Sequence, residues 1–376
     1  MTHKFAQLAE NLLCAPGRGV HTVHTASDKK IRLDNLLYDL KDGQERDATA
    51  LWSDKLKSLP SHQGAVILGI CSDTGGGIQR GANWGPLVVR VALAEASRLE
   101  GTLDLGDVRV VPHLLHDKYL NQETISEVRE ALYNNREADY TVSPLSMTEE
   151  VLESFYREYP QLPVFSLGGD HSVSYALVGP YLKAKRAQGK KVALLHFDAH
   201  TDLLTKRLGI DLCFGSWVPP ILQFLPDTRC CAQVGIRSTG KHKAHWEKTF
   251  GLKQYWAHEV KEEGPLAIAR AIKEQYSAYG VEEMYVSFDI DALDKSFAAA
   301  TGTPEDEGLA PHECLQIMQE LEKDFPISGA DLVEVAPFVQ FDHAQNNSMV
   351  QTLDSAQIIG GYLIEALNRW SHKQGQ

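Results

Sequence analysis

The sequence predicts an α/β fold, a three-layer α/β/α sandwich with a mainly parallel central sheet. Short apolar runs alternate with longer stretches of helical periodicity, which is the pattern of strands joined by helical crossovers. Three of these runs end in acidic or imidazole side chains, and ligands bind at the carboxyl ends of parallel strands. The hydrophobic fraction of 43% excludes the fibrous and disordered classes.

The elements follow in chain order. Residues 64–376 are expected to form one catalytic domain, and residues 1–63 an extension ahead of it, with His21 and His24 on its surface. The expected strands cover residues 65–70, 108–111, 163–165, 232–236 and 329–335, and two more begin at residues 192 and 284. The expected helices cover residues 85–99, 147–156, 264–279, 310–325 and 355–370. A further helix after residue 171 is expected to break or kink at Gly179-Pro180.

The strand that begins at Val192 ends in the motif Asp198-Ala-His-Thr-Asp202. Because side chains alternate between the faces of a strand, Asp198, His200 and Asp202 would share one side with His196. Burying carboxylates beside imidazoles is costly unless a cation compensates for the lost solvation. These donors suit Mn²⁺, Zn²⁺, Fe²⁺ or Ni²⁺. The alternative interpretation is a hydrogen-bonded strand end with a solvated acid cluster.

Two other expected strands end in the same residue types. His171 follows a Gly-Gly turn, with Ser172 as the expected N-cap of the next helix, and Asp289 and Asp291 lie on one face of the strand that contains them. The candidate metal ligands are therefore six, too many for one four-coordinate ion: His171, Asp198, His200, Asp202, Asp289 and Asp291. They suit two ions with bridging carboxylates.

These motifs resemble those of the ureohydrolase superfamily of arginases and agmatinases. The matching signatures are Gly168-Gly-Asp-His171-Ser, Asp198-Ala-His-Thr-Asp202, Ser287-Phe-Asp289-Ile-Asp291-Ala-Leu-Asp294 and Thr301-Gly-Thr-Pro-Glu305. Arg80-Gly-Ala-Asn-Trp-Gly-Pro86 and Asp331-Leu-Val-Glu334-Val-Ala-Pro337 resemble two further elements of that group. The resemblance extends from about Gly64 to the C-terminus and implies an arginase-like fold.

The resemblance also implies roles for individual residues. In the superfamily pattern, one manganese ion binds His171 and Asp202, the other binds His200 and Asp291, and Asp198 and Asp289 bridge the two. A hydroxide between the two Mn²⁺ ions attacks the carbon of a planar cation. Asp202 would take up the proton and pass it to the leaving amine, and Glu305 would bind the guanidinium or amidinium group.

The sequence departs from the superfamily pattern around the expected pocket. Phe214, in Asp211-Leu-Cys-Phe214-Gly-Ser-Trp217, stands where many members have a histidine, and His242 and His245 are candidate substitutes. The loop from Asp294 to Thr301 lacks two prolines and a glycine of the pattern. Phe214 and Thr301 are therefore expected to line an altered substrate pocket. The glycines 75–77 are expected to form a pocket loop, because they lack phosphate-binding spacing.

The resulting functional prediction is a binuclear manganese hydrolase that cleaves a C–N bond of a linear guanidino or amidino compound, as an agmatinase or guanidino acid hydrolase does. The alternatives are an arginase, a guanidine hydrolase, a formimidoylglutamase and a non-catalytic metal-binding relative. A deacetylase is disfavoured because its tandem histidines are not seen.

Glu334 would be either an acid that supports the metal site or part of an ion pair.

Composition predicts the kinds of partner and the cell compartment of the protein. The formal net charge of −13 disfavours nucleic acid and anionic membranes as partners and favours a cationic small substrate. Six cysteines without disulfide or zinc spacing indicate reduced thiols in a cytoplasm. No signal peptide or membrane-spanning run is evident. The resemblance implies a homo-oligomer, a trimer or a hexamer.

Overall fold

The computed structural model describes residues 3–20, 26–40, 47–339 and 348–374, so His21 and His24 lie outside the described residues. One sheet has the strand order β1-β3-β2-β4-β9-β8-β5-β6-β7, and all its neighbouring strands are parallel except β1 and β3. The strands are β1 (Leu13–Cys14), β2 (Val66–Ile70), β3 (Leu103–Val108), β4 (Val164–Gly168), β5 (Val192–Phe197), β6 (Cys231–Ile236), β7 (Lys253–Trp256), β8 (Glu283–Asp289) and β9 (Ile327–Val333).

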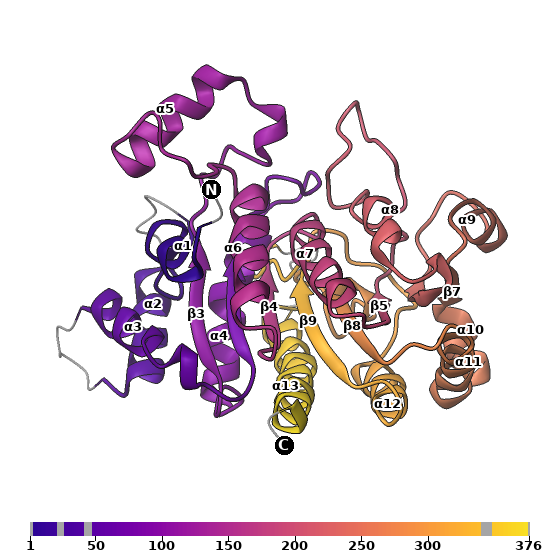
Figure 1. Ribbon diagram of the computed structural model, residues 1–376. Coiled ribbons are helices and arrows are strands. Elements are labelled where there is room, and N and C mark those ends of the chain that lie inside the picture. Colours follow the sequence, from indigo (N-terminus) through magenta and orange to yellow (C-terminus); the bar gives the residue numbers. More distant parts are fainter. Residues whose placement is uncertain (1–2, 21–25, 41–46, 340–347, 375–376) are drawn as a thin grey trace.

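Helices cover both faces of this sheet (Figure 1), with α6 and α7 on one face and α4, α12 and α13 on the other. The helices are α1 (Phe5–Leu12), α2 (Ser27–Tyr38), α3 (Ala48–Leu56), α4 (Gly85–Glu95), α5 (Gln122–Tyr133), α6 (Pro144–Glu158), α7 (Val173–Ala187), α8 (Val218–Ile221), α9 (Lys243–Phe250), α10 (Ala257–Glu263), α11 (Pro265–Ala278), α12 (Pro311–Glu322) and α13 (Ser348–Gln374). The predicted α/β/α sandwich with a mainly parallel sheet is confirmed. None of the described helices is both long and apolar enough to cross a membrane.

The second predicted strand was misplaced. The structure has β3 at Leu103–Val108 instead of residues 108–111, and Asp104 and Asp107 lie within it. Both acids bind the fully buried guanidinium of Arg90 on α4, at 2.9 Å and 2.5 Å. Because the partner that neutralises these acids is distant in the sequence, a search for apolar runs does not find the strand.

One of the two expectations about α7 was also wrong. The helix continues through Pro180 without a break, and most of its residues are buried against the sheet and α6. Tertiary packing therefore outweighs the hydrogen bond that the proline cannot donate. The other expectation is confirmed in position, since Ser172 is the N-cap residue of α7, although its hydroxyl makes no capping bond.

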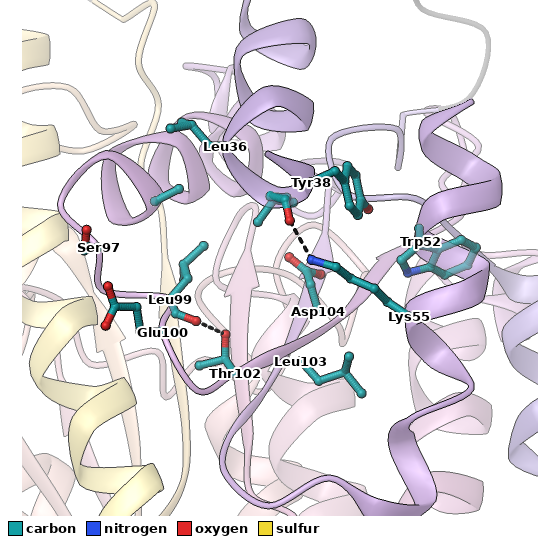
Figure 2. Close-up of a pocket in the computed structure, with 12 residues that line it drawn as sticks. Leu36, Tyr38, Trp52, Lys55, Ser97, Leu99, Glu100, Thr102, Leu103 and Asp104 are labelled. Carbon is teal, nitrogen blue, oxygen red and sulfur yellow. Dashed lines mark hydrogen bonds between the residues drawn. The ribbon is translucent and has the colours of Figure 1, made fainter. Parts of the chain in front are cut away.

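The N-terminal residues pack against this chain's own sheet. α1 contacts α6, and β1 adds an antiparallel strand beside β3. Between α2, α3 and β3 lies a cavity of about 280 Å³ (Figure 2), where Lys55 Nζ donates to the carbonyl oxygen of Leu37 at 2.6 Å. The division of the chain at residue 64 stays a prediction.

The buried ion pairs of Arg90 should contribute strongly to stability. We expect Arg90→Ala to lower the free energy of unfolding by about 3–5 kcal/mol, because it leaves the buried carboxylate of Asp107 and the partly buried carboxylate of Asp104 without a cation. Urea unfolding measures this loss. The control is Arg98→Ala, whose ion pair with Glu365 is about half exposed on both sides and should cost less than about 1 kcal/mol. Equal losses in the two variants would contradict the prediction.

Candidate metal centre

Adjacent parallel strands bring all six predicted ligands to one edge of the sheet. β4, β9, β8 and β5 are neighbours in that order, and each is followed directly by a polar segment. β4 leads to His171, β5 to Asp198, His200 and Asp202, and β8 to Asp289 and Asp291. Since parallel strands end at the same edge, these side chains converge although they are far apart in the sequence.

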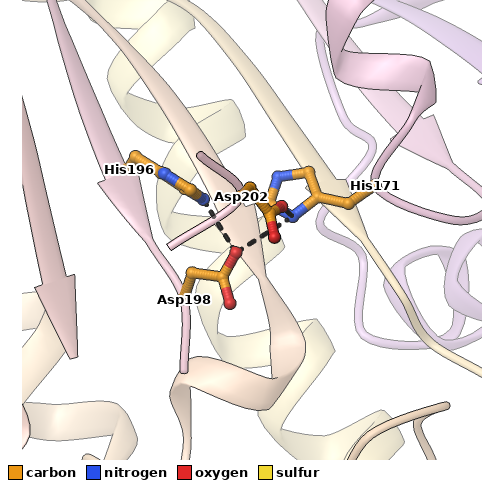
Figure 3. A group of neighbouring side chains, drawn as sticks. All are labelled: His171, His196, Asp198 and Asp202. Atoms are coloured by element: carbon orange, nitrogen blue, oxygen red, sulfur yellow. Dashed lines mark hydrogen bonds and ion pairs between the residues drawn. The ribbon is translucent and has the colours of Figure 1, made fainter. Parts of the chain in front are cut away.

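The first group of donors surrounds the ring of His171. Its Nδ1 atom lies 3.3 Å from Asp198 Oδ2, 3.2 Å from Asp202 Oδ2 and 3.1 Å from Asp289 Oδ2. Figure 3 shows His171, Asp198 and Asp202 pointing toward one another. All four side chains are buried, so solvent does not separate their charges.

The hydrogen bonds of His171 indicate the tautomer of its neutral ring, and so which nitrogen carries the lone pair. Nε2 lies 3.1 Å from the hydroxyl of Ser287, and that hydroxyl donates to Asp331 at 2.8 Å. Ser287 therefore accepts from Nε2–H, and in the neutral ring Nδ1 presents a lone pair. Nδ1 has no hydrogen-bond partner among the described atoms. A lone pair facing three carboxylates is repelled unless a proton or a metal cation lies between them, so this donor set fits a divalent metal ion that takes the place of the proton.

The second group of donors surrounds His200. Its Nδ1 atom lies 3.1 Å from Asp291 Oδ2 and 3.4 Å from Asp198 Oδ1. Asp198 thus directs one oxygen to each group, as a bridging carboxylate does. Asp289 Oδ2 lies in the first group, and its Oδ1 accepts the backbone N–H of Asp291 at 2.8 Å, so its bridging role stays a prediction.

The reason given above for this convergence was wrong. β5 ends at Phe197, and residues 198–202 do not continue the strand. Asp202 has a left-handed backbone with φ of 51°. The chain therefore turns, and this turn, rather than strand alternation, brings Asp198, His200 and Asp202 together.

His196 lies next to the first group, but its hydrogen bonds indicate that it supports the ligand Asp198 and does not itself bind a metal ion. Gln233 Nε2 donates to the carbonyl oxygen of Thr201 at 2.6 Å, which fixes the orientation of the amide, and it also lies 3.0 Å from His196 Nδ1. His196 Nδ1 therefore accepts, and Nε2–H donates to Asp198 Oδ2 at 2.9 Å. Gln254 extends this buried chain by donating to Gln233 Oε1 at 2.8 Å.

Trp217 is a contact of the centre that the sequence did not predict. Its indole N–H donates to Asp202 Oδ2 at 2.8 Å, and its ring packs against His171 and His196 with centroid separations of 4.8 Å and 5.1 Å. A tryptophan in this stretch matches no ligand motif. Only the folded chain shows that it restrains Asp202.

Glu334 supports the centre through the backbone. Its Oε1 accepts the N–H of His171 at 2.9 Å, and its own backbone is left-handed with φ of 63°. In the described part of the chain it forms no ion pair. Of its two predicted roles, the structure therefore favours the supporting one.

Of the other predicted site residues, Glu305 lies next to the second group, whereas His242 and His245 lie outside both groups. Glu305 Oε1 is 3.6 Å from His200 Nε2, and Thr303, which the sequence did not single out, donates to Asp291 at 2.9 Å. Thr301 is fully buried and its hydroxyl has no partner among the described atoms, so its pocket role stays a prediction. His242 and His245 are exposed near the start of α9 and contribute no atom to either group.

The backbone around Glu305 is held by Arg237, which follows β6. Its guanidinium donates to the carbonyl oxygens of Asp291, Glu305 and Asp306 at 2.8, 3.1 and 2.8 Å. One side chain thus connects the loop of a predicted ligand to the loop of the predicted substrate-binding acid.

Charge crowding shifts the acid–base equilibria of the centre. Burial, together with Asp291 and Asp198, raises the pKa of Asp289 well above its usual range, and burial and Asp198 raise the pKa of Asp202. Burial would also raise the pKa of Asp198, but the neighbouring imidazoles of His171, His196 and His200 hold it well below its usual range. Without a metal ion, protons must therefore neutralise the group.

The Arginase family model matches residues 63–356. The chain belongs to the arginase family. The resemblance inferred from the motifs is thus confirmed, and the chain is a metal-dependent amidinohydrolase.

Individual relatives share most of the length of this arginase-family chain. Human mitochondrial guanidino acid hydrolase is 30% identical over 298 residues, which cover 78% of this chain and 77% of that protein. Chicken mitochondrial agmatinase is 29% identical over 292 residues, covering 76% and 77%. The solved structure of a hypothetical agmatinase from Burkholderia thailandensis has a TM-score of 0.60 at 25% identity, covering 84% and 88%. Arginase from Bacillus subtilis shares the fold, with a TM-score of 0.59 at 21% identity, covering 80% and 98%.

The hydrogen-bond chain through Gln233 should strengthen metal binding. We expect Gln233→Leu to weaken Mn²⁺ binding roughly 10- to 100-fold, because it releases the ring that orients Asp198. Calorimetric titration of the metal-free protein measures this. The control is Gln223→Leu, whose exposed side chain bonds only the carbonyl oxygen of Pro220. Unchanged affinity in a folded Gln233→Leu protein would contradict the role of the chain.

Metal binding should release protons. Burial opposes protonation of His200, but Asp291 and Asp198 raise its pKa to about 12, and Asp198, Asp202 and Asp289 likewise raise the pKa of buried His171 well above its usual range. Both rings are protonated at neutral pH without metal, and Nδ1 must lose its proton to bind an ion. We expect Mn²⁺ affinity to rise between about pH 6 and 8, roughly tenfold per pH unit for each proton released.

Calorimetry in two buffers of different ionisation enthalpy counts the released protons. A pH-independent affinity, with no difference between the buffers, would show that the imidazoles are already neutral.

Proposed function

We propose that this protein is a binuclear Mn²⁺ hydrolase that cleaves a C–N bond of a linear guanidino acid. The observation that carries the proposal is the pair of donor groups that share Asp198, with Glu305 beside the second group. The names of the human and chicken relatives, a guanidino acid hydrolase and an agmatinase, support a guanidino compound as the substrate class.

Two bound Mn²⁺ ions supply a water molecule acidic enough to attack at neutral pH. His171, Asp202, His200 and Asp291 would hold the ions, and Asp198 and Asp289 would bridge them. Asp202 is the proposed proton carrier, since its carboxylate lies within the first group of donors, close to the atoms that would hold the ions. The indole of Trp217 holds one of its oxygens, so the carboxylate keeps one orientation while it takes up and returns a proton.

Glu305 is the proposed binding residue for the cationic head of the substrate. Its carboxylate is partly exposed, next to His200, and can form a bidentate pair with a guanidinium. Arg237 fixes its backbone, so the head group would lie at a set position relative to the metal ligands.

Phe214 places an apolar ring where many relatives have a histidine. Its ring contacts the loop of glycines 75–77, with Gly77 against its edge. Phe214 cannot carry a proton, so in this proposal proton transfer depends on Asp202. The ring instead gives the substrate an apolar wall.

Three further properties stay proposals. They are two Mn²⁺ per subunit, with Ni²⁺ or another divalent ion as an alternative, a homo-oligomeric state of three or six subunits, and a cytoplasmic location. All six cysteines are free in the structure.

The test is release of urea and ammonia by the Mn²⁺-loaded protein from guanidinobutyrate, guanidinopropionate, agmatine, arginine, guanidine and formiminoglutamate. Turnover of a guanidino acid that disappears in Asp202→Asn, while both ions remain bound, would support the proposal. No turnover of any of these compounds by a protein with two bound ions would refute it.

Glu305→Gln should lower kcat/KM roughly 10- to 100-fold, because it replaces a charge-assisted contact with a neutral one. Steady-state kinetics on the best substrate measure the change. The control is Glu307→Gln, two residues away in the same loop and exposed. If both variants lose activity equally, the total negative charge of the loop, rather than a contact between Glu305 and the substrate, accounts for the effect.

A further inference from the structure

A second cavity lies between the loop of glycines 75–77 and the segment that carries Arg207 and Phe214. Its volume is about 420 Å³, and its walls include Gly75, Gly77, His113, Tyr119, Arg207 and Phe214. No aspartate or glutamate is among its lining residues, although the chain has 50 acidic and 37 basic side chains. Its lining is therefore apolar and basic, whereas the metal centre is acidic.

Short backbone contacts join this cavity to the metal-binding loop. The N–H of Phe214 donates to the carbonyl oxygen of Gly75 at 3.0 Å, and the N–H of Gly75 donates to Asp170, the neighbour of His171, at 3.0 Å. A Cβ atom on Gly75 would lie 2.2 Å from the hydroxyl oxygen of Ser172, so only glycine permits this approach. One wall of the cavity thus rests on residues that flank a predicted ligand.

The opposite wall is the segment between β5 and α8, which extends beyond the strand ends (Figure 1). Its part after Asp202 contains a tight turn, in which Arg207 and Ile210 exchange backbone hydrogen bonds of 2.7 and 3.0 Å. The two central residues, Leu208 and Gly209, have φ of 50° and 89°. A leucine in this left-handed region costs about 1–2 kcal/mol, whereas glycine adopts it without strain.

The turn places the guanidinium of Arg207 over the ring of Phe214, 4.9 Å from its centroid. Within the described residues no carboxylate lies within ion-pair distance of Arg207. The nearby acid Asp211 is already engaged, since it binds Lys118 at 3.0 Å and accepts from the hydroxyl of Tyr119. Arg207 is therefore a positioned cation that faces an apolar cavity without a counter-ion from the protein's described part.

We propose that this cavity binds the tail of the substrate and that Arg207 binds a carboxylate at the end of that tail. The inference rests on the proposed function and makes it more specific. The metal centre and Glu305 take the cationic head, Phe214 contacts the aliphatic spacer, and Arg207 forms the planar two-point contact that guanidinium makes with a carboxylate. Compounds that end in an amine meet a like charge at Arg207, so the site selects guanidino acids over guanidino amines.

The test compares 4-guanidinobutyrate with agmatine, since both join a guanidino group through a short aliphatic spacer to a charged end, an anion in one and a cation in the other. We expect Arg207→Ala to raise KM for the acid roughly 10- to 100-fold with little change in kcat, and Arg207→Glu to shift the preference toward agmatine. The control is Lys206→Ala, which removes the adjacent positive charge of the same loop but no residue of the cavity wall. Equal effects of Lys206→Ala and Arg207→Ala, or an unchanged KM for the acid, would overturn the inference.

A binding measurement separates this inference from the proposed reaction. Calorimetric titration of the Mn²⁺-loaded protein with hexanoate and with hexylamine requires no turnover. Binding of hexanoate that is lost in Arg207→Ala and retained in Lys206→Ala would support the carboxylate site even if no guanidino compound were hydrolysed. Binding of hexanoate that is unchanged in Arg207→Ala, or no binding to the parent protein, would overturn it.

Discussion

The structure depends on a balance of charge at the carboxyl ends of β4, β8 and β5. Four buried carboxylates, those of Asp198, Asp202, Asp289 and Asp291, lie around two imidazoles. Removing so many charges from water is unfavourable by several kcal/mol for each ion unless cations lie among them. The need for cations therefore decides which residue types can occupy these strand ends, and the surrounding fold holds them there.

A second layer of hydrogen bonds fixes each donor before any ion binds. Asp331 accepts hydrogen bonds from the hydroxyls of Tyr285 and Ser287. The oxygen of Ser287 can then accept from His171 Nε2, which keeps that nitrogen pointing away from the centre. Gln233 does the same for His196 from the opposite side. These partners come from β6, β8 and β9, which are rigid and buried, so the ligand positions follow from the sheet itself.

The surroundings of the centre differ on its two sides. On the side of β6, Arg237 connects the loops of Asp291 and Glu305, and Glu305 is the acid proposed to bind a cationic head group. On the side of Phe214, the cavity wall is apolar, and the guanidinium of Arg207 lies over the phenyl ring. A site that attracts opposite charges at its two ends suits a substrate that carries both, which is the electrostatic basis of the specificity proposed here.

The sequence by itself determined the fold class, the family and the convergence of the six predicted ligands. Apolar runs that end in acids and histidines are local patterns, and parallel strands necessarily bring their ends to one edge. Only the tertiary structure decided the contacts that depend on distant partners. Arg90 made an acidic segment into the buried strand β3, a turn at Asp202 replaced the expected strand, and the chain placed Trp217 on Asp202 and Arg207 over Phe214. These features depend on backbone turns and on contacts between residues of different elements or of irregular loops, and the period of a helix or strand does not contain that information.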